Sequence, residues 1–399
     1  MKLELHSIAD MGKVVTGKTP STKNALYWDG EYPFVTPSDL EFRHYRCGTT
    51  ERYVSSEAKD RFRNQFIPEG AVMFTSIGNT IGKCAIATTD SLTNQQINSI
   101  IANEESDNKY IYYLLCNNVE QVRVLGGGSS TPIVKKTTFE NIRFRIHDFP
   151  AQQRIASILS TYDDLIENNL RRIKLLEDSA RQLYKEWFVR LRFPGYEHTK
   201  CVKGVPNRWE KGKISDYYYT GSGGTPSRKV PEYFTGDILW VKTQELQNEF
   251  IIDTNEKITE AALNNSSARM FPKWSVLIAM YGATIGQLGI LAYSATTNQA
   301  CCSLFSKRKD IYNIFAYLFL RENKQNLVNL GQGSAQNNVN QEVIKDFEMI
   351  FPSKNIIDNF VESLEPSFNQ ILNLQIQNLK LKQARDILLP KLMCGEVEV

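Results

Sequence analysis

The sequence predicts a mixed α/β protein of the α+β class that is built twice. Two tandem regions of short strands and helices are each followed by a long helix. Two observations lead to this prediction: an internal repeat of about half the chain, and two long stretches with apolar residues at helical spacing. The 399 residues are enough for two or three domains, each with its own core.

The repeat is carried by short motifs that return in the same order. GKTPS at 17–21 returns as GGTPS at 223–227, 206 positions later. GNTIG at 78–82 returns as GATIG at 282–286, and TNQ at 93–95 returns at 297–299, both 204 positions later. Leu125-Gly126 returns as Leu330-Gly331. One unit has therefore been duplicated, and its two copies have diverged between the shared motifs.

Each copy begins with a region of short elements. The apolar runs at 71–75 and 275–280 are typical of buried strands, and the stretches at 110–116 and 314–320 are typical of short helices. A segment rich in Pro, Gly and Lys, at about 193–209, predicts a linker. The expected order is a first domain at 1–149, a long helix at 150–195, a second domain at 196–352 and a last long helix at 353–399.

A proline opens the long helical section of each copy, Pro150 in the first and Pro352 in the second. Each helix could lie on a globular core. Its length of about 40 residues and the presence of two such helices favour a coiled coil instead. Asn169 and Asn378 occupy seam positions, where a polar residue can fix register. The apolar residues expected at the helix–helix seam are Ile155, Ile158, Tyr162, Leu165, Leu176, Leu183, Phe360, Leu364, Ile371, Leu374, Leu381 and Leu388.

Composition excludes several classes of protein. No run approaches 18 apolar residues and the N-terminus has no apolar signal region, so we expect no membrane span and a cytoplasmic location. Seven cysteines without a CxxC pair, and four scattered histidines, predict neither a disulfide framework nor a metal site. The formal net charge of +3 permits a nucleic-acid partner only where cations cluster.

Catalytic motifs are missing from the sequence. GNTIGK at 78–83 is one residue shorter than a phosphate-binding P-loop, and Gln287 replaces its lysine in the second copy. No two prolines adjoin, so the Asn-Pro-Pro-aromatic segment of amino-methyltransferases is absent. A carboxylate–x–Lys triplet such as Asp107 to Lys109 is too common in charged chains to indicate a nuclease. We expect no catalytic residue in this chain.

The residues that recur suit close backbone approach and hydrogen bonding. Glycine permits tight turns, and Asn, Gln, Ser and Thr can bond base edges and phosphates. The alternative is that the shared residues form turns and caps. In that case, the residues that contact DNA bases lie in the divergent loops beside them. Ten basic residues fit contacts with DNA phosphates, and the alternative for each is a place on the solvated surface. They are Lys135, Lys136, Arg143, Arg145, Arg228, Lys229, Lys242, Lys307, Arg308 and Lys309.

These motifs together resemble the DNA specificity subunit of type I restriction-modification enzymes, over the whole chain. The resemblance rests on the duplicated GxTPS, GxTIG and TNQ motifs, the two long helices, and the closing segments LYKEWFVRLRFPG at 183–195 and LLPKLMCG at 388–395. Two departures are Gly224 in place of Lys18 and Ala300 in place of Gln96.

The resemblance implies two target recognition domains separated by antiparallel spacer helices. Each domain would read one part of a bipartite, asymmetric double-stranded DNA target. Two methyltransferase subunits and two restriction subunits would join the chain. They would bring S-adenosylmethionine, ATP and Mg²⁺, and would methylate adenine and restrict DNA. A helix of about 40 residues is roughly 60 Å long, enough to separate two domains by more than one DNA turn.

DNA contacts are expected in three loops of each copy. The residues expected to contact DNA are Thr75, Ser76, Asn79, Thr80, Thr93, Asn94, Gln95, Gln96, Ser129, Ser130, Lys135, Lys136, Tyr281, Thr284, Thr297, Asn298, Gln299, Ser334, Gln336, Asn337, Asn338 and Asn340. Two other functions remain open from the sequence. One is a duplicated coiled-coil scaffold that does not read DNA, and the other is a specificity subunit of a system that only methylates.

Overall fold

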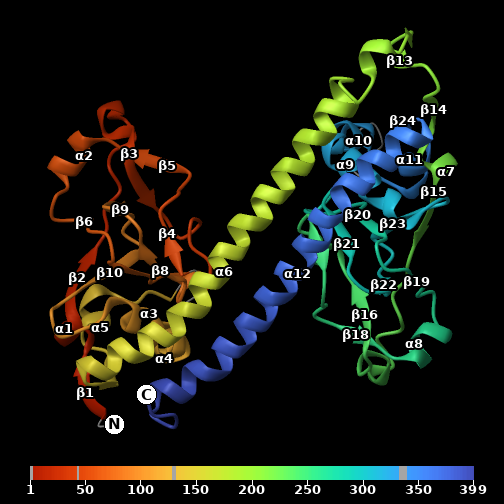
Figure 1. Cartoon of the computed structure of the whole chain (residues 1–399). Coiled ribbons are helices and arrows are strands. Elements are labelled where there is room, and N and C mark those ends of the chain that lie inside the picture. Colours follow the sequence, from red (N-terminus) through yellow and green to blue (C-terminus); the bar gives the residue numbers. More distant parts are fainter. Residues whose placement is uncertain (1–2, 43–44, 128–131, 332–338) are drawn as a thin grey trace. The chain divides into compact units, whose positions relative to one another are not determined.

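The computed structural model describes residues 3–42, 45–127, 132–331 and 339–399. The chain forms two compact units, one of Met1–Glu167 with Leu379–Val399 and the other of Asn168–Asn378. Each unit therefore contains one copy of the repeat and a part of both long helices (Figure 1). This division differs from the expected boundaries, which set each long helix apart from the domains.

In the first unit, the main layer is a five-stranded sheet in the order β2-β10-β7-β8-β4. Its strands are β2 (Gly12–Thr16), β4 (Arg46–Cys47), β7 (Val72–Thr75), β8 (Cys84–Ala87) and β10 (Ile97–Ala102). A four-stranded sheet has the order β5-β3-β9-β6 and contains β3 (Trp28–Val35), β5 (Arg52–Val54), β6 (Phe66–Ile67) and β9 (Ser91–Thr93). β1 (Leu3–Ser7) pairs with β11 (Arg143–His147). Only β4–β8 and β3–β9 are parallel pairs among these strands.

The core of the first unit lies between the five-stranded sheet and its helices. These helices are α1 (Ile8–Met11), α3 (Asn108–Asn117), α4 (Val119–Val124) and α5 (Lys136–Glu140), whereas α2 (Ser56–Arg61) packs on the four-stranded sheet. α3 starts at the N-cap Asp107, whose Oδ1 accepts a hydrogen bond from the Tyr110 amide at 2.9 Å. Its residues from Tyr110 to Cys116 are all buried, and they pack with Phe74 of β7 and Leu392 near the C-terminus.

The second unit repeats this plan strand for strand. Its sheets have the orders β15-β23-β20-β21-β17 and β18-β16-β22-β19, with β14 paired to β24. The strands are β14 (Glu210–Lys213), β15 (Tyr218–Ser222), β16 (Ile238–Val241), β17 (Glu249–Ile251), β18 (Lys257–Ile258), β19 (Met270–Phe271), β20 (Val276–Ala279), β21 (Leu288–Leu291), β22 (Ala295–Thr297), β23 (Cys301–Ser306) and β24 (Glu348–Phe351). The helices are α7 (Ile214–Tyr217), α8 (Glu260–Asn264), α9 (Asn313–Glu322), α10 (Lys324–Gly331) and α11 (Gln341–Asp346). The duplication predicted from sequence is thus confirmed in the fold.

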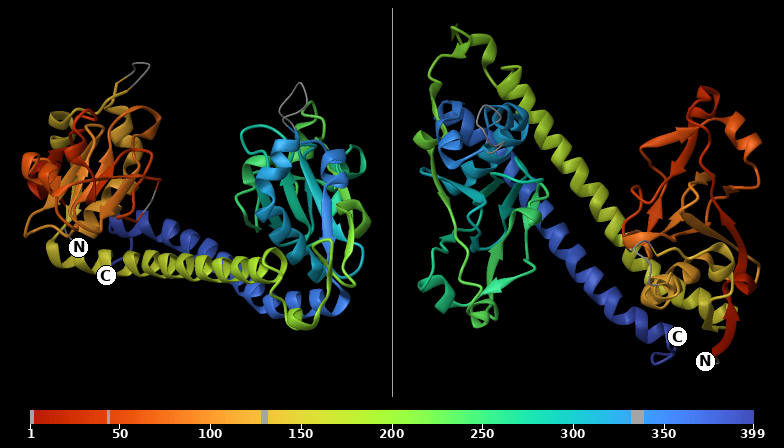
Figure 2. Two further views of the ribbon diagram at one scale, coloured as in Figure 1. Left: turned by 90° about the horizontal axis from the view of Figure 1, so that it is seen from above. Right: turned by 180° about the vertical axis from the view of Figure 1, so that it is seen from behind.

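Two long helices complete the units. α6 (Phe149–Tyr184) continues as one turn of π-helix (Lys185–Val189), and α12 spans Lys354–Met393 (Figure 2). The linker after α6 holds a small hairpin of β12 (Cys201–Val202) and β13 (Val205–Pro206). Within the second unit the helices run antiparallel, because Trp187 lies beside Phe360 while Asn169 Nδ2 donates to Asn378 Oδ1 at 2.9 Å. In the first unit, Arg385 near the end of α12 bonds Asp163 in α6.

The helix–helix seam departs from the expected one in the first unit. Ile158 and Leu165 are 37% and 46% exposed, so their assignment to the seam is wrong. The buried stripe runs instead along residues spaced by three and four, namely Ala156, Leu159, Asp163 and Ile166, and continues along α6 into the second unit with Asn169 and Ile173. This stripe contains a carboxylate and an amide. A search for apolar residues alone therefore places the seam one position away from the buried stripe. Of the other expected seam residues, Ile155, Phe360, Leu364, Ile371 and Leu374 are buried, and Tyr162, Leu176, Leu183, Leu381 and Leu388 are half-buried.

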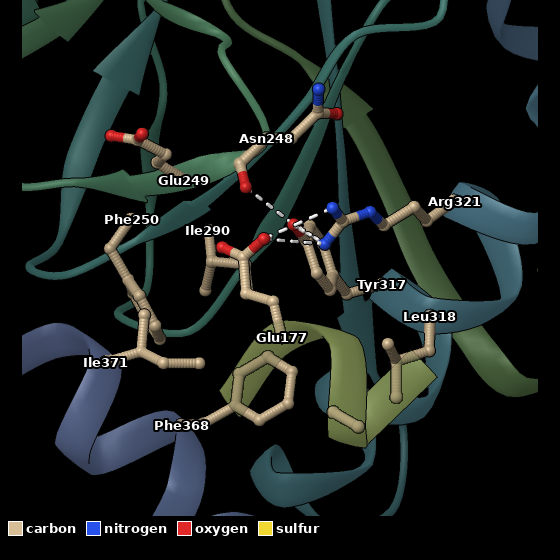
Figure 3. Close-up of a pocket in the computed structure, with 11 residues that line it drawn as sticks. Glu177, Asn248, Glu249, Phe250, Ile290, Tyr317, Leu318, Arg321, Phe368 and Ile371 are labelled. Carbon is tan, nitrogen blue, oxygen red and sulfur yellow. Dashed lines mark hydrogen bonds and ion pairs between the residues drawn. The ribbon is translucent and has the colours of Figure 1, made fainter. Parts of the chain in front are cut away.

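A half-buried polar network joins the second unit's domain to its helices (Figure 3). Both terminal nitrogens of Arg321 in α9 donate to Glu177 Oε2 in α6 at 3.2 Å. The hydroxyl of Tyr317 donates to the backbone oxygen of Asn248 at 2.7 Å. Burial raises the pKa of Glu177, and Arg321 opposes that shift. Phe368 of α12 closes the same cluster.

The equivalent tyrosine of the first unit bonds α6 directly. Tyr113, 204 positions before Tyr317, donates to Asp163 Oδ2 in α6 at 2.6 Å, and Arg385 binds the other oxygen. The side chains of Asp163 and Arg385 are only 3% and 6% exposed. Each copy therefore packs on the long helices through one shared tyrosine and a different ion pair, which is buried in the first unit and half-buried in the second.

Candidate functional site

In the first unit, the strand ends bring the predicted loops together. Ile97 at the start of β10 is paired with Thr75 at the end of β7, and Thr93 at the end of β9 is paired with Val35 at the end of β3. The loops after these strands therefore lie at one edge. The backbone amide of Ser76 donates to Gln96 at 2.8 Å, which holds two of the loops against each other.

The third loop joins the same edge, and the second unit repeats the arrangement. The Val134 amide donates to the Ser76 carbonyl at 2.9 Å. In the second unit, the Met280 amide donates to Ala300 and the Val339 amide donates to Met280, both at 2.9 Å. Each unit thus gathers its three predicted loops into one surface, which we call the loop face: residues 76–83, 94–96 and 132–136 in the first unit, and 280–287, 298–300 and 339–340 in the second.

The shared motifs contact one another at the loop face. Thr19 Oγ1 donates to Gln95 Oε1 at 2.7 Å, and Thr225 Oγ1 donates to Gln299 Oε1 at 2.6 Å. A Cβ on Gly17 would lie 2.1 Å from the carbonyl oxygen of Thr93, so only glycine allows the two chains to approach. GxTPS and TNQ recur together because they form this contact.

Burial removes four of the expected DNA contacts from the loop face. Thr75, Ser76, Thr93 and Thr297 are at most 4% exposed. Thr75 Oγ1 donates to the Thr80 carbonyl, Ser76 Oγ accepts from Asn98 Nδ2 at 2.8 Å, and Thr297 Oγ1 accepts from the Gly223 amide at 3.2 Å. The expectation for these four residues is wrong, because their hydroxyls are buried inside the domain and cannot reach a base.

Several other expected residues are half-buried and bonded within their own loops. Asn94 Oδ1 accepts from the Gln96 amide at 3.0 Å, and Asn298 Oδ1 accepts from the Ala300 amide at 3.1 Å. Thr80 Oγ1 donates to the Ile77 carbonyl at 2.6 Å. Thr284 is also half-buried. These side chains shape the loops, and only part of their hydrogen-bonding capacity remains for a ligand.

The exposed residues of the loop face differ between the two copies. Of the residues expected to contact DNA, the exposed ones are Asn79, Gln95, Lys135 and Lys136 in the first unit, and Tyr281, Gln299 and Asn340 in the second; only Gln95 and Gln299 are equivalent and identical. Ile133 of the first unit is also 51% exposed. Lys136 forms an ion pair with Glu140 at 3.5 Å, and Asn340 Oδ1 caps α11 by accepting from the Val343 amide. The expected residues Ser129, Ser130, Ser334, Gln336, Asn337 and Asn338 lie outside the described residues.

The basic residues divide between the two ends of the sheets. Lys307, Arg308 and Lys309 follow the end of β23, whose start adjoins the loop face, so they lie at the opposite edge. Arg143 and Arg145 belong to β11, which pairs with β1 ahead of β2. These five do not join the loop face.

Two cations of the second unit lie beside its loop face. Arg228 and Lys242 form ion pairs with Glu256 at 2.7 and 2.8 Å. Hydrogen bonds from Arg228 and then Lys242 hold the pKa of Glu256 below its usual range. The carboxylate therefore stays ionised, and it fixes both cations next to GGTPS. Lys229, the next residue along the chain, is exposed.

Sequence reasoning missed the exposed Phe42, in the loop that follows β3. The available signal was the change in repeat offset from 206 to 204, which marks an insertion between the GxTPS and GxTIG motifs. In the described part of the chain, no group of three or more His, Cys, Asp or Glu residues could hold a metal ion. None of its described helices is long and apolar enough to cross a membrane.

Comparisons with known proteins agree on one family. The sequence profile of the "Type I restriction modification DNA specificity domain" matches residues 2–178 and 206–381. The chain is 28% identical to the type I restriction enzyme MjaIX specificity subunit of Methanocaldococcus jannaschii, over 99% of this chain and 94% of that protein. It is 24% identical to the HindI specificity subunit of Haemophilus influenzae, over 72% of this chain and 77% of that protein.

A solved structure has the same fold. The S subunit of a type I restriction-modification system from M. genitalium matches 98% of this chain and 96% of that chain, with a TM-score of 0.64 at 15% identity. The family profile covers most of both copies of the repeat, which excludes the scaffold that does not read DNA. The chain therefore belongs to the type I restriction-modification DNA specificity family, as a specificity subunit that carries the family's domain once in each unit.

Proposed function

We propose that this specificity subunit reads a bipartite, asymmetric DNA target, with the loop face of each unit contacting one half. The observation that carries the proposal is that the two units share one fold and one set of loop contacts but expose different side chains. Asn79 and Lys135 in the first unit stand where the second has Ala283 and Asn340. Side chains that differ on a common framework read different bases, so the two half-targets differ.

The reactions on that DNA belong to partner subunits. Two methyltransferase subunits would assemble with this chain and methylate adenine, which requires flipping the base into their pocket. Two restriction subunits would add ATP-driven translocation and cleavage. S-adenosylmethionine, ATP and Mg²⁺ would bind those partners, and the complex would act in the cytoplasm. The net charge of +3 supports modest DNA binding by this chain alone, and the partner subunits would add further DNA contacts.

The test is an adenine methylation map. A host without adenine methylation co-expresses this chain with the methyltransferase subunit encoded beside it, and modified adenines are mapped across the genome. We expect one split motif with two unlike halves, methylated throughout. A stable complex of the two proteins without any modified motif would refute the proposal. Cleavage of unmethylated target DNA after addition of the restriction subunit separates a full system from one that only methylates.

A further inference from the structure

The loop that joins β3 to β4 starts like its counterpart in the second unit. Asp39 Oδ2 accepts from the Thr36 amide, and Glu245 Oε2 accepts from the Lys242 amide, both at 2.8 Å. The next residue in each case is a leucine, Leu40 or Leu246, that is at most 1% exposed. These pairs lie 206 positions apart, so both loops leave the sheet in the same way.

Beyond the buried leucine, the first loop contains two extra residues. Arg46 pairs with Ile86, and Phe250 pairs with Ile290, at equivalent strand positions only 204 apart. The shorter loop closes on itself through Asn248, which adopts φ +63° and bonds Gln287 at 2.9 Å. The connection between these strands therefore needs no insertion, and the first copy carries one that the fold does not require.

The longer loop exposes an aromatic side chain. Phe42 is 51% exposed, and the Arg123 guanidinium lies 5.9 Å from the centre of its ring. Arg123 in turn donates to the Ile81 carbonyl at 3.0 Å, within GNTIG. Lys83 Nζ donates to the Pro37 carbonyl at 2.8 Å and ties the same two loops together. Phe42 thus adjoins the loop face, in a segment held by charge-assisted hydrogen bonds.

An exposed aromatic beside cations fits a ligand with apolar rings and negative charge. Phe42 contributes little to the core, and the second copy folds without it. Arg123, which is also paired with Glu120 at 2.5 Å, and the exposed Lys135 of the same loop face favour a polyanion. Phenylalanine contacts DNA through thymine methyl groups or by insertion between base steps.

We propose that Phe42 makes an apolar contact with a base of the half-target bound by the first unit, from an inserted loop that the second unit lacks. This inference rests on the proposed function. It adds an asymmetry between the two half-targets, because only the first unit carries an aromatic side chain on this inserted loop. The contact carries no charge, so its loss leaves the salt dependence of binding unchanged.

The experiment compares Phe42→Ala with the wild-type chain, each co-purified with the methyltransferase subunit. The DNA is a duplex that carries the target found by methylation mapping of the wild-type complex. Binding is titrated at several salt concentrations. We expect Phe42→Ala to weaken target binding about tenfold with an unchanged slope of log K against log salt, and Phe42→Trp to restore binding. Lys135→Ala should instead reduce the slope by about one.

The matched control is Leu5→Ala, since Leu5 is 60% exposed but lies in β1, away from the loop face. It should bind like wild type. Uracil in place of each target thymine distinguishes a methyl contact from insertion between bases, because only the former is lost with the methyl group. Equal binding by Phe42→Ala and wild type would overturn the inference, as would loss of the methyltransferase subunit from Phe42→Ala. Failure of the wild-type complex to select any target would refute the proposed function instead.

Discussion

At the residue scale, the motifs shared by both copies build the loop face, and the residues that differ are free to read DNA. The same internal hydrogen bond forms in each unit, between Thr19 and Gln95 and between Thr225 and Gln299. This division explains why conspicuous hydroxyls such as Thr93 turned out to be buried. It also means that stability and specificity can be changed by separate substitutions.

Asp358 provides a test of electrostatic stability in the second unit. It accepts from Lys309, Tyr312 and Lys354, and these bonds hold its pKa well below the usual range. A lowered folded-state pKa gives stability that is complete above the unfolded value, about 3.9, and is lost as the pH falls. Asp358→Asn should cost about 1–2 kcal/mol at pH 7.

The measurement is thermal unfolding of wild type and Asp358→Asn between pH 7 and 3. The difference in unfolding free energy should shrink once the pH falls below about 4. Asp310→Asn, which changes an acid at the start of a neighbouring short turn, serves as the control. A difference that stays constant across this pH range would show that the Asp358 charge does not contribute.

Replacing only one member of the buried Asp163–Arg385 ion pair should strongly lower the stability of the first unit. Arg385→Met leaves a carboxylate buried with Tyr113 as its remaining partner, and we expect a loss of about 3–5 kcal/mol. The double variant with Asp163→Asn removes the uncompensated charge and should recover about half of that loss. Hydrogen exchange of the α3 amides reports the stability of the first unit. A double variant as unstable as Arg385→Met alone would contradict this account.

At the element scale, α6 and α12 carry buried polar groups where a plain apolar seam would be more stable. Asn169 and Asn378 share one hydrogen bond, and the side-chain nitrogen Nδ2 of Asn378 has no hydrogen-bond partner in the described structure. Such a pair costs free energy and favours one register over others. The helices therefore combine modest stability with a fixed alignment.

Replacing both asparagines by leucine should raise the stability of the second unit by about 1–2 kcal/mol. Urea unfolding followed by tryptophan fluorescence measures this, because Trp187, Trp209, Trp240 and Trp274 all belong to that unit. Asn169→Leu alone should be less stable than the double variant, since it leaves Asn378 with no side-chain partner. If the double variant proved less stable than wild type, the pair would be stabilising rather than costly.

Sequence patterns predicted the helices and strands better than they predicted which face of each helix is buried. The repeated motifs located both sheets because each motif marks a turn that needs particular residues, as Gly17 shows. The seam in the first unit could not be located, because Asp163 lies in the buried stripe and a charged residue is normally assigned to the surface. Its partner Arg385 is 222 residues away, so no local pattern could indicate that the charge is paired.

At the scale of the whole molecule, the first unit's contacts decide where recognition domains can be exchanged. Residues 1–149 include Arg46 and Tyr113, but their partners Asp164, Glu167 and Asp163 lie on α6. A foreign domain joined at residue 149 would thus meet acidic residues matched to the domain it replaces. The beginning of α6 belongs with the first domain, as the division of the chain after Glu167 indicates.

Two chimaeras test this boundary, with either residues 1–149 or residues 1–167 taken from another family member. Both should change one half of the methylated motif and leave the other half intact. The 1–167 chimaera should be the more stable when both retain Arg385, since it keeps each domain with its own helix segment. Methylation mapping and thermal unfolding provide the two readouts. A change in both halves of the motif would contradict the separate reading of half-targets.

The first unit is assembled from both ends of the chain, and this has a consequence for biosynthesis. Leu389, Leu392 and Met393 fill its core, and Arg385 neutralises Asp163. A ribosome needs roughly 10–40 seconds to translate residues 168–378 before these residues emerge. The nascent N-terminal domain must wait through that interval with apolar surface uncovered. A premature stop between codons 379 and 393 would therefore damage the domain that was translated first.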